Sequence, residues 1–139
     1  MPKFGKTSKA RLETCHEDLQ TLFNHIVEAV DCSIICGHRG EEEQNEAFAK
    51  GNSQKEYPHG KHNGMPSRAV DVCPYPIDWN DRERFYYFAG YVLSQAQILK
   101  ELGEIIHNIR WGGNWRGFKN GVIDFSKNTF DDLPHFELI

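Results

Sequence analysis

The first apolar pattern in the chain has the spacing of an amphipathic helix. Apolar side chains recur every three or four residues from Leu12 to Val30, which places them on one face of a helix. Thr7 or Ser8 can cap its N-terminus, because a side-chain hydroxyl accepts a hydrogen bond from the first free amide groups. The pattern therefore predicts a first helix that reaches Val30, followed by a short strand over residues 32–37.

Two further helices are expected. A short one is predicted over residues 41–50 and ends at Gly51, and its acidic first turn suits the positive end of the helix dipole. A longer one begins near Asp78 or Asn80, either of which can act as the N-cap, and ends before Gly103. The apolar face of the longer helix comprises Phe85, Phe88, Val92, Ala96 and Leu99.

The remaining strands are short and irregularly placed. They are predicted over residues 69–73, 105–111 and 135–138. Residues 51–67 and 111–121 are rich in glycine and polar residues and read as loops, and long loops in compact domains are often functional. Strands and helices do not alternate as regular βαβ units. The pattern therefore predicts an α+β fold, in which helices cover a small antiparallel sheet.

Length, charge and hydropathy narrow the class of protein. The 139 residues suit a single domain, 1–139, without repeats or linkers. No segment approaches the roughly 20 apolar residues of a membrane span. The basic N-terminus has no apolar core, so no secretory signal is expected, and the protein should stay in the cytosol where it is made unless something else releases it. The net charge of −4 argues against a nucleic-acid binder that relies on phosphate contacts.

The cysteines do not follow a metal-binding or redox pattern. None of the four is part of a CxxC motif, so a zinc knuckle or a thioredoxin-type site is not expected. In a reducing cytosol they are expected to be small buried hydrophobic residues, although the sequence does not exclude a disulfide. The four are Cys15, Cys32, Cys36 and Cys73.

One aspartate lies inside an apolar run that is predicted to be a buried strand. Asp71 is the central residue of AVDVC (69–73). Burying an unpaired carboxylate is costly, so Asp71 requires a metal ion, an arginine or a hydrogen-bond network beside it. The same question arises near the C-terminus. There His135 sits in a second apolar strand, with Asp132 three residues before it and Glu137 two residues after it.

Zinc is one answer to this question. A catalytic zinc ion commonly has three protein ligands and one water, and His62, Asp71 and His135 would supply imidazole and carboxylate ligands of the right kind. Asp132 would then lie near enough to move the proton of that water. The motif HExxH is absent. On spacing alone an ion-paired aspartate and a hydrogen-bonded core histidine remain open alternatives.

Four segments together resemble a known family. They are GHRGEEEQ (37–44), KHNGMPSRAVDVCPYPIDW (61–79), RWGGNW (110–115) and DDLPHFEL (131–138). In order and separation they resemble the phage L-alanyl-D-glutamate endopeptidases, which belong to the group of zinc D-alanyl-D-alanine carboxypeptidases and dipeptidases. The resemblance spans most of the chain after residue 30, and it implies the small hedgehog-like α+β fold of that group.

The resemblance implies a role for each matching residue. It implies that His62, Asp71 and His135 bind Zn²⁺. Asp132 corresponds to the catalytic carboxylate of the family. Arg39 corresponds to an arginine that is thought to hold the substrate carboxylate or the developing oxyanion. A polar residue that often follows this arginine in the family corresponds to Gln44, for which no role is assigned.

The chain departs from the most familiar form of the family motif. His62 and Asp71 are nine positions apart, where that form has seven. This leaves His59 as a rival to His62, although the frame of Lys61-His62-Asn63 favours His62. Asp132 stands where many relatives have glutamate, and Asp131 is a rival with the wrong offset. The pattern does not decide whether Glu137 supports His135, contacts substrate or faces solvent.

The aromatic loop residues also carry an open question. Trp111 and Trp115 could line a substrate groove. The alternative is that they belong to the core or its rim, where large aromatic residues are more often found. For Arg39 the alternative to a substrate-binding role is that of a surface or ion-pairing residue.

The resemblance implies a zinc peptidase that hydrolyses the L-Ala–D-Glu bond in the stem peptide of bacterial peptidoglycan. It implies a phage endolysin that waits in the host cytoplasm and reaches the wall after release. A monomer is expected, and charge and hydropathy predict neither nucleic-acid nor membrane partners. One alternative is a D-Ala–D-Ala carboxypeptidase of the same group. Others are a noncatalytic wall-binding or zinc-binding module, and a phage protein whose Asp–His network binds no metal.

Overall fold

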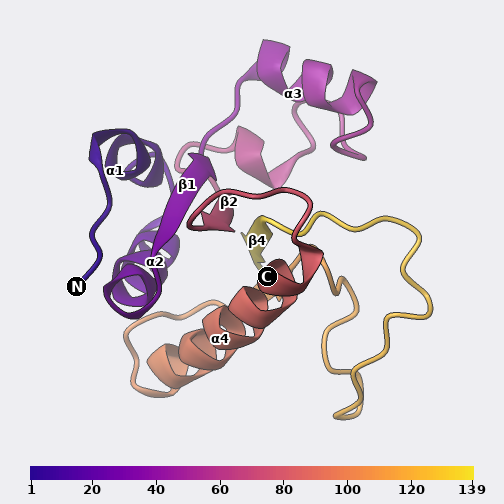
Figure 1. Ribbon diagram of the computed structural model, residues 1–139. Helices are drawn as coiled ribbons and strands as arrows, with labels where there is room; N and C mark the ends of the chain where they lie inside the picture. Colours follow the sequence, from indigo (N-terminus) through magenta and orange to yellow (C-terminus); the bar gives the residue numbers. More distant parts are fainter.

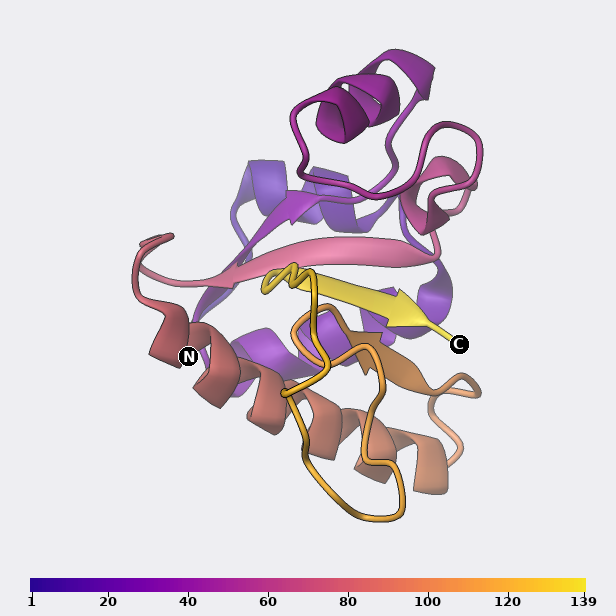
Figure 2. The same cartoon turned by 90° about the vertical axis from the view of Figure 1, so that its right-hand side faces the viewer.

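The computed structural model describes all 139 residues, and it has an α+β fold (Figure 1). Four antiparallel strands form one sheet in the order β1-β2-β4-β3. The strands lie between α3 and α4 in both views (Figures 1 and 2). The predicted fold class is therefore confirmed. The elements are α1 (Lys6–Leu12), α2 (Glu17–Ala29), β1 (Cys32–Cys36), α3 (Glu41–Ala49), the 3₁₀ turn η1 (Lys61–Asn63), β2 (Ala69–Pro74), α4 (Arg82–Glu101), β3 (Ile109–Trp111) and β4 (His135–Leu138).

The core forms because α2 and α4 bury their apolar faces against one side of the sheet. Twenty-three buried hydrophobic residues form a single cluster. Phe136 of β4 is at its centre, and its ring meets Phe23 of α2 edge to face, with centroids 5.4 Å apart. Side chains alternate across a strand, so Val70 and Val72 join this cluster while Asp71 between them points to the other side.

The predicted first helix is two helices. α1 ends at Leu12, and α2 begins at Glu17 with His16 as its N-cap. The intervening segment turns at Glu13 and Thr14 and then forms a bridge between Cys15 and Ser67, which lies far along the chain. The amide of His16 donates to the carbonyl of Ser67 (2.8 Å), and the amide of Ser67 donates to the carbonyl of Thr14 (2.9 Å). This tertiary pairing overrides the continuous helical pattern.

The start of α4 also differs from the prediction. Its N-cap is Asp81, whose carboxylate accepts from the amide of Arg84, and neither Asp78 nor Asn80 serves this role. Instead, the Asp78 side chain accepts from the amide of Asn80 at 3.0 Å, which makes a turn just before the helix. The C-terminal prediction is confirmed, since Gly103 lies just past the helix with a φ of +79°.

The strand predicted over residues 105–111 is shorter, because a buried carboxylate holds its first half. Asp18 of α2 accepts from the amides of Ile106 (3.0 Å) and His107 (3.1 Å) and from Nδ1 of His107 (2.7 Å). These bonds draw residues 106 and 107 toward α2, and only Ile109–Trp111 enters the sheet. None of the helices is both long and apolar enough to cross a lipid bilayer.

Replacing Asp18 with asparagine is predicted to destabilise the fold in a pH-dependent way. Burial raises the pKa of Asp18, but the hydrogen bonds from His107 and Ile106 outweigh this and leave it below its ordinary value. A carboxyl group with a lowered pKa stabilises the fold above its unfolded-state pKa, and this stabilisation is lost as the pH falls through the folded-state pKa. Urea unfolding at neutral pH should show a loss of about 1–3 kcal/mol for Asp18→Asn.

The difference between Asp18→Asn and the wild type should shrink once the pH falls below about 4, where an unperturbed aspartate becomes protonated. The control is Asp31→Asn, because Asp31 is exposed and a surface change of this kind should alter stability by less than about 0.5 kcal/mol. An equal loss at neutral and acid pH would contradict the role given to the Asp18 carboxylate.

Candidate metal centre

The strand register brings Asp71 and His135 together. They are direct partners on the antiparallel strands β2 and β4, and the side chains of such a pair lie on the same face of the sheet, with Cβ atoms about 4.5–5.5 Å apart. Their neighbours Val70 and Phe136 form the next pair and point into the core. Alternation therefore turns Asp71 and His135 to the face of the sheet away from the core.

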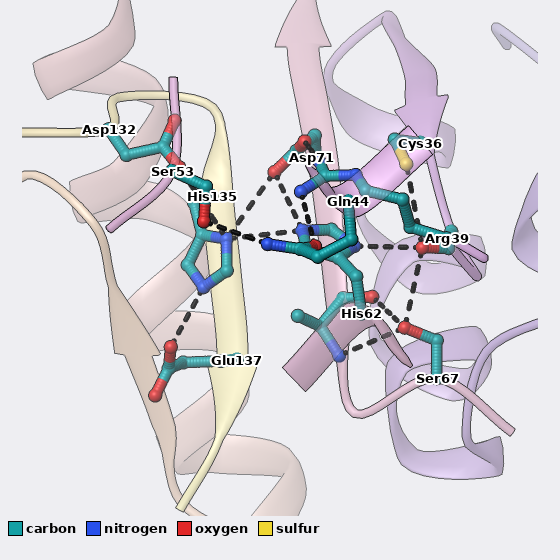
Figure 3. A network of polar contacts seen from close by, with 12 residues as sticks. Cys36, Arg39, Gln44, Ser53, His62, Ser67, Asp71, Asp132, His135 and Glu137 are labelled. Atoms are coloured by element: carbon teal, nitrogen blue, oxygen red, sulfur yellow. Dashed lines mark hydrogen bonds and ion pairs between the residues drawn. The ribbon is translucent and has the colours of Figure 1, made fainter. Parts of the chain in front are cut away.

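His62 reaches the same point from the loop between α3 and β2. It lies in the η1 turn, where its Nδ1 hydrogen-bonds to the carbonyl of Gly37 (2.8 Å) and its own carbonyl accepts from the amide of Arg39 (2.8 Å). These two bonds fasten the turn to the segment that follows β1. They leave Nε2 of His62 directed at Asp71 and His135, as the close-up in Figure 3 shows.

Three donor atoms form a nearly equilateral triangle. Nε2 of His62 is 3.3 Å from Oδ1 of Asp71 and 3.3 Å from Nδ1 of His135, and the third edge, from Nδ1 of His135 to Oδ1 of Asp71, is 3.4 Å. A tetrahedral zinc ion with bonds of about 2.0–2.1 Å would hold its ligand atoms about 3.3–3.4 Å apart. The residues therefore fit a zinc ion in both chemical type and spacing.

The hydrogen bonding of Asp71 supports the same fit. Its Oδ2 accepts from Nη2 of Arg39 at 3.3 Å, but its buried Oδ1 has no hydrogen-bond partner. A buried polar atom without a partner is rare and costly, and a cation at the centre of the triangle would satisfy it. Burial alone would raise the pKa of Asp71. The neighbouring His62 and His135 imidazoles lower it by more than burial raises it, and they keep the carboxylate ionised.

Other potential ligands lie close by. The Sγ atom of Cys36 and donor atoms of His62 and Asp71 lie within 4.8 Å of one another, as do donor atoms of Asp71, Asp132 and His135. Cys36 is half-buried rather than part of the core, because the register between β1 and β2 shifts between Ile34 and Cys36. The four cysteines form no disulfide.

Asp132 lies at the edge of the triangle. Its Oδ2 is 3.7 Å from Nδ1 of His135. A tight turn brings the two together, since the amide of His135 donates to the carbonyl of Asp132 (3.1 Å). Burial and the negative charge of Asp71 raise the pKa of Asp132 to about 6. A carboxyl group with such a pKa can accept and return a proton near neutral pH.

A glycine at the end of β3 permits this turn. The amide of Gly112 donates to the carbonyl of His135 (2.8 Å), and its carbonyl accepts from the amide of Asp132 (2.8 Å). A Cβ atom at Gly112 would lie 2.2 Å from the carbonyl oxygen of Asp132 and 3.0 Å from Cβ of His135. Any larger residue would push the Asp132 turn away from the triangle.

A buried glutamine, Gln44, holds Arg39 beside Oδ2 of Asp71, the carboxylate oxygen that is not part of the triangle. Nη1 of Arg39 donates to Oε1 of Gln44 (3.0 Å), while Nη2 pairs with Asp71. The amide nitrogen of Gln44 donates to Oγ of Ser53 (3.0 Å) and to the carbonyl of Lys55 (2.6 Å). Arg39 is therefore both an ion-pair partner of Asp71 and a residue that faces the site, and Gln44 sets its position.

One cleft of about 330 Å³ is lined by His62, His135, Asp132, Arg39 and Gln44. Trp115 and Phe130 are its only hydrophobic lining residues. They stack on each other, and the indole of Trp115 donates to the carbonyl of Phe130 (3.0 Å). Trp111, by contrast, is buried in the core and donates to the carbonyl of Leu133 (2.7 Å). The open question about the two tryptophans is thus answered differently for each.

The cleft is lined by more basic than acidic side chains. Its acidic lining residues are Asp132 and Glu137, in a chain whose net charge is −4. An excess of positive charge in a cleft attracts anionic ligands. The basic side chains that line it are Arg39, Lys55, Lys61 and Arg110.

The two rival residues lie outside the triangle. His59 lines the cleft but is exposed, and it is not part of the cluster of donor atoms. Asp131 pairs with Arg82 at the start of α4, with a closest N–O distance of 2.5 Å. The geometry thus favours His62 over His59 and Asp132 over Asp131.

Glu137, which the sequence left with three possible roles, contacts His135 and two cations. Its Oε1 lies 2.8 Å from Nε2 of His135, on the side of the ring away from Asp71. Lys61 and Arg110 pair with its Oε2. Burial raises the pKa of Glu137, but its hydrogen bonds with His135 and Arg110 lower it to about 2. Glu137 therefore does not face bulk solvent, since it contacts His135 and also lines the cleft.

The comparisons with known proteins agree with this architecture. A family model described as phage L-alanyl-D-glutamate peptidase matches residues 1–139. The fold is similar to the crystal structure of the L-Ala D-Glu endopeptidase ChiX from Serratia marcescens. The TM-score is 0.71 and the sequence identity 25%, over 99% of this chain and 91% of that one. No curated protein sequence matched the chain. The chain thus belongs to the phage L-alanyl-D-glutamate peptidase family.

Proposed function

We propose that this protein is a zinc-dependent endopeptidase that hydrolyses the L-Ala–D-Glu bond in the stem peptide of bacterial peptidoglycan. The observation that carries the proposal is the triangle of donor atoms from His62, Asp71 and His135, one corner of which is a buried carboxylate oxygen that lacks a hydrogen-bond partner. Membership in a peptidase family and the likeness to an L-Ala D-Glu endopeptidase support the choice of reaction.

Zinc bound to this triangle would lower the pKa of a water to about 7 and polarise the scissile carbonyl. Asp132 is the general base that takes a proton from the attacking water, since its Oδ2 lies 3.7 Å from Nδ1 of His135, one of the proposed ligand atoms. The same carboxyl group then returns the proton to the leaving amine of D-Glu. Its raised pKa, about 6, suits both roles.

Arg39 holds negative charge on the substrate. Its guanidinium group faces the cleft beside Asp71 and is kept there by Gln44. Because the guanidinium carries five N–H donors, contacts with Asp71 and Gln44 leave donors for a substrate carboxylate or for the oxyanion that develops during attack. The other basic side chains of the cleft favour the same anionic peptide.

The proposal includes the setting in which the enzyme acts. The chain is taken as a single catalytic domain, residues 1–139, that works as a monomer. As a phage endolysin it would accumulate in the host cytoplasm and reach the cell wall only after release. Its partner is the stem peptide, with no role for nucleic acid or membrane.

The metal site is tested by zinc content and by three histidine variants. Elemental analysis of the purified wild type should give about one zinc per chain, whereas His62→Ala and His135→Ala should each retain little, because each removes one of three ligands. His59→Ala is the matched control and should retain zinc like the wild type. A wild type that is folded, metal-free and unable to take up added zinc would disprove the metal site.

The role of Asp132 is tested by Asp132→Asn. The variant should lose about 10²- to 10⁴-fold in kcat, since an amide cannot shuttle the proton, and should keep its zinc. Asp131→Asn is the control, because Asp131 pairs with Arg82 outside the triangle. Equal loss of activity in both variants, or near wild-type activity in Asp132→Asn, would argue against Asp132 as the general base.

The scissile bond is tested by mass spectrometry of a digest of defined muropeptides. The proposal predicts release of peptides that begin with D-Glu, with the bond between the two terminal D-Ala residues left intact. Release of free D-Ala would identify the alternative D-Ala–D-Ala carboxypeptidase. Binding to the wall without any cleavage by the zinc-loaded protein would favour a noncatalytic module.

A further inference from the structure

His135 has different partners at its two ring nitrogens. Nδ1 faces Oδ1 of Asp71 (3.4 Å) and Nε2 of His62 (3.3 Å), whereas Nε2 lies 2.8 Å from Oε1 of Glu137. Figure 3 shows this arrangement, with Asp71 and Glu137 at different corners of the ring. The proposed function uses only the Nδ1 side and leaves the contact with Glu137 unexplained.

Glu137 is held in place by two cations. Its Oε2 accepts from Nη2 (2.8 Å) and Nε (3.2 Å) of Arg110, the residue directly opposite it on β3, and it pairs with Nζ of Lys61 (3.2 Å). Lys61 also donates to the backbone carbonyl of Leu138. The Glu137 side chain is only 7% exposed, so these contacts are poorly screened by solvent.

This arrangement has a consequence for the proton on His135. A neutral imidazole carries one proton, either on Nδ1 or on Nε2. A carboxylate oxygen accepts only, so Glu137 at 2.8 Å requires the proton on Nε2 and would repel a bare nitrogen there. The lone pair of His135 is then on Nδ1, where it faces His62 and Asp71. With the other tautomer the Nδ1 proton would point at Asp71 and exclude a metal ion.

We infer that Glu137, held by Lys61 and Arg110, is a positioning residue that selects the tautomer of His135 and makes Nδ1 its metal ligand. This inference rests on the zinc site of the proposed function. Contacts of this kind typically change metal affinity by 10- to 100-fold when they are removed. The two cations also bind the second oxygen of Glu137, which keeps that carboxylate from turning toward the metal.

Lys61 extends this role to a second ligand. It precedes His62 in the η1 turn, and it binds both the side chain of Glu137 and the backbone carbonyl of Leu138 in β4. One side chain thus ties the loop that carries His62 to the strand that carries His135. The Lys61–Glu137–Arg110 cluster therefore orients one histidine and fixes the distance between the two.

The variant Glu137→Gln distinguishes tautomer selection from simple packing. Glutamine has nearly the shape of glutamate but only one acceptor oxygen. Arg110 and Lys61 are donors and would take that oxygen, which turns the amide NH₂ group toward Nε2 of His135. The amide donates a hydrogen bond there, so Nε2 becomes the acceptor and the imidazole proton of His135 is on Nδ1 instead. Glutamine would thus favour the tautomer that excludes the metal.

The test is the zinc dissociation constant, measured by competition with a chromogenic chelator, for the wild type, Glu137→Ala and Glu137→Gln. Both variants should bind zinc at least 10-fold more weakly than the wild type, and Glu137→Gln should be no better than Glu137→Ala. Thermal unfolding of the metal-free proteins measures the structural effect separately. Long-range ¹H–¹⁵N NMR of the zinc-loaded wild type should show a protonated Nε2 on His135.

Glu46→Gln is the matched control. Glu46 also pairs with a cation, Lys50 at 2.6 Å, but the pair is exposed on α3 and remote from the histidines, so the zinc dissociation constant should not change. Wild-type affinity in Glu137→Gln would overturn the inference. A glutamine variant that binds zinc clearly better than the alanine variant, in parallel with its metal-free stability, would also overturn it and leave a structural role.

The two proposals fail in different ways. If the wild type binds no zinc, both the proposed function and the role of Glu137 are wrong. If the wild type binds zinc tightly and the Glu137 variants do the same, only the positioning role is wrong and the proposed function stands.

Discussion

The antiparallel register between β2 and β4 is the constraint on which the rest of the structure depends. It pairs Val70 with Phe136 on the core side and Asp71 with His135 on the other side. A slip of one residue would turn every side chain of a strand to the opposite face, placing charged groups in the core and valines in the cleft. The packing of α2 and α4 on one side therefore also secures the geometry of the ligands on the other.

Ion pairs explain how several charged groups are tolerated in a small volume. Asp71 pairs with Arg39, and Glu137 pairs with both Lys61 and Arg110. Breaking a buried ion pair by removing one partner typically costs about 3–5 kcal/mol, because the remaining charge is left uncompensated. The ion pairs thus stabilise the cleft only as a complete set, and Oδ1 of Asp71 is a buried acceptor among them that still lacks a hydrogen-bond partner.

The fold class and the short strands could be predicted from local pattern alone. The alternating segment 135–138 matches β4 residue for residue, and the apolar run 69–73 lies within β2. The break between α1 and α2 could not be predicted, since it arises from pairing with Ser67, more than 50 residues away. The shortening of β3 has a similar cause, because Asp18 reaches it from α2.

The site was accessible to sequence reasoning mainly through resemblance. A nine-residue interval between His62 and Asp71 has no regular geometry, and only the η1 turn, fastened to Gly37 and Arg39, explains how the two meet. Contacts such as those of Gln44 with Arg39 and of Glu137 with Lys61 depend on the assembled sheet and loops.

The central claim is that three atoms hold the metal: Nε2 of His62, Oδ1 of Asp71 and Nδ1 of His135. Anomalous diffraction at the zinc edge from zinc-soaked crystals tests it most directly. A single peak about 2.0–2.2 Å from all three atoms is predicted. A peak bonded to Cys36 or displaced from these three atoms, or no peak at all, would contradict it.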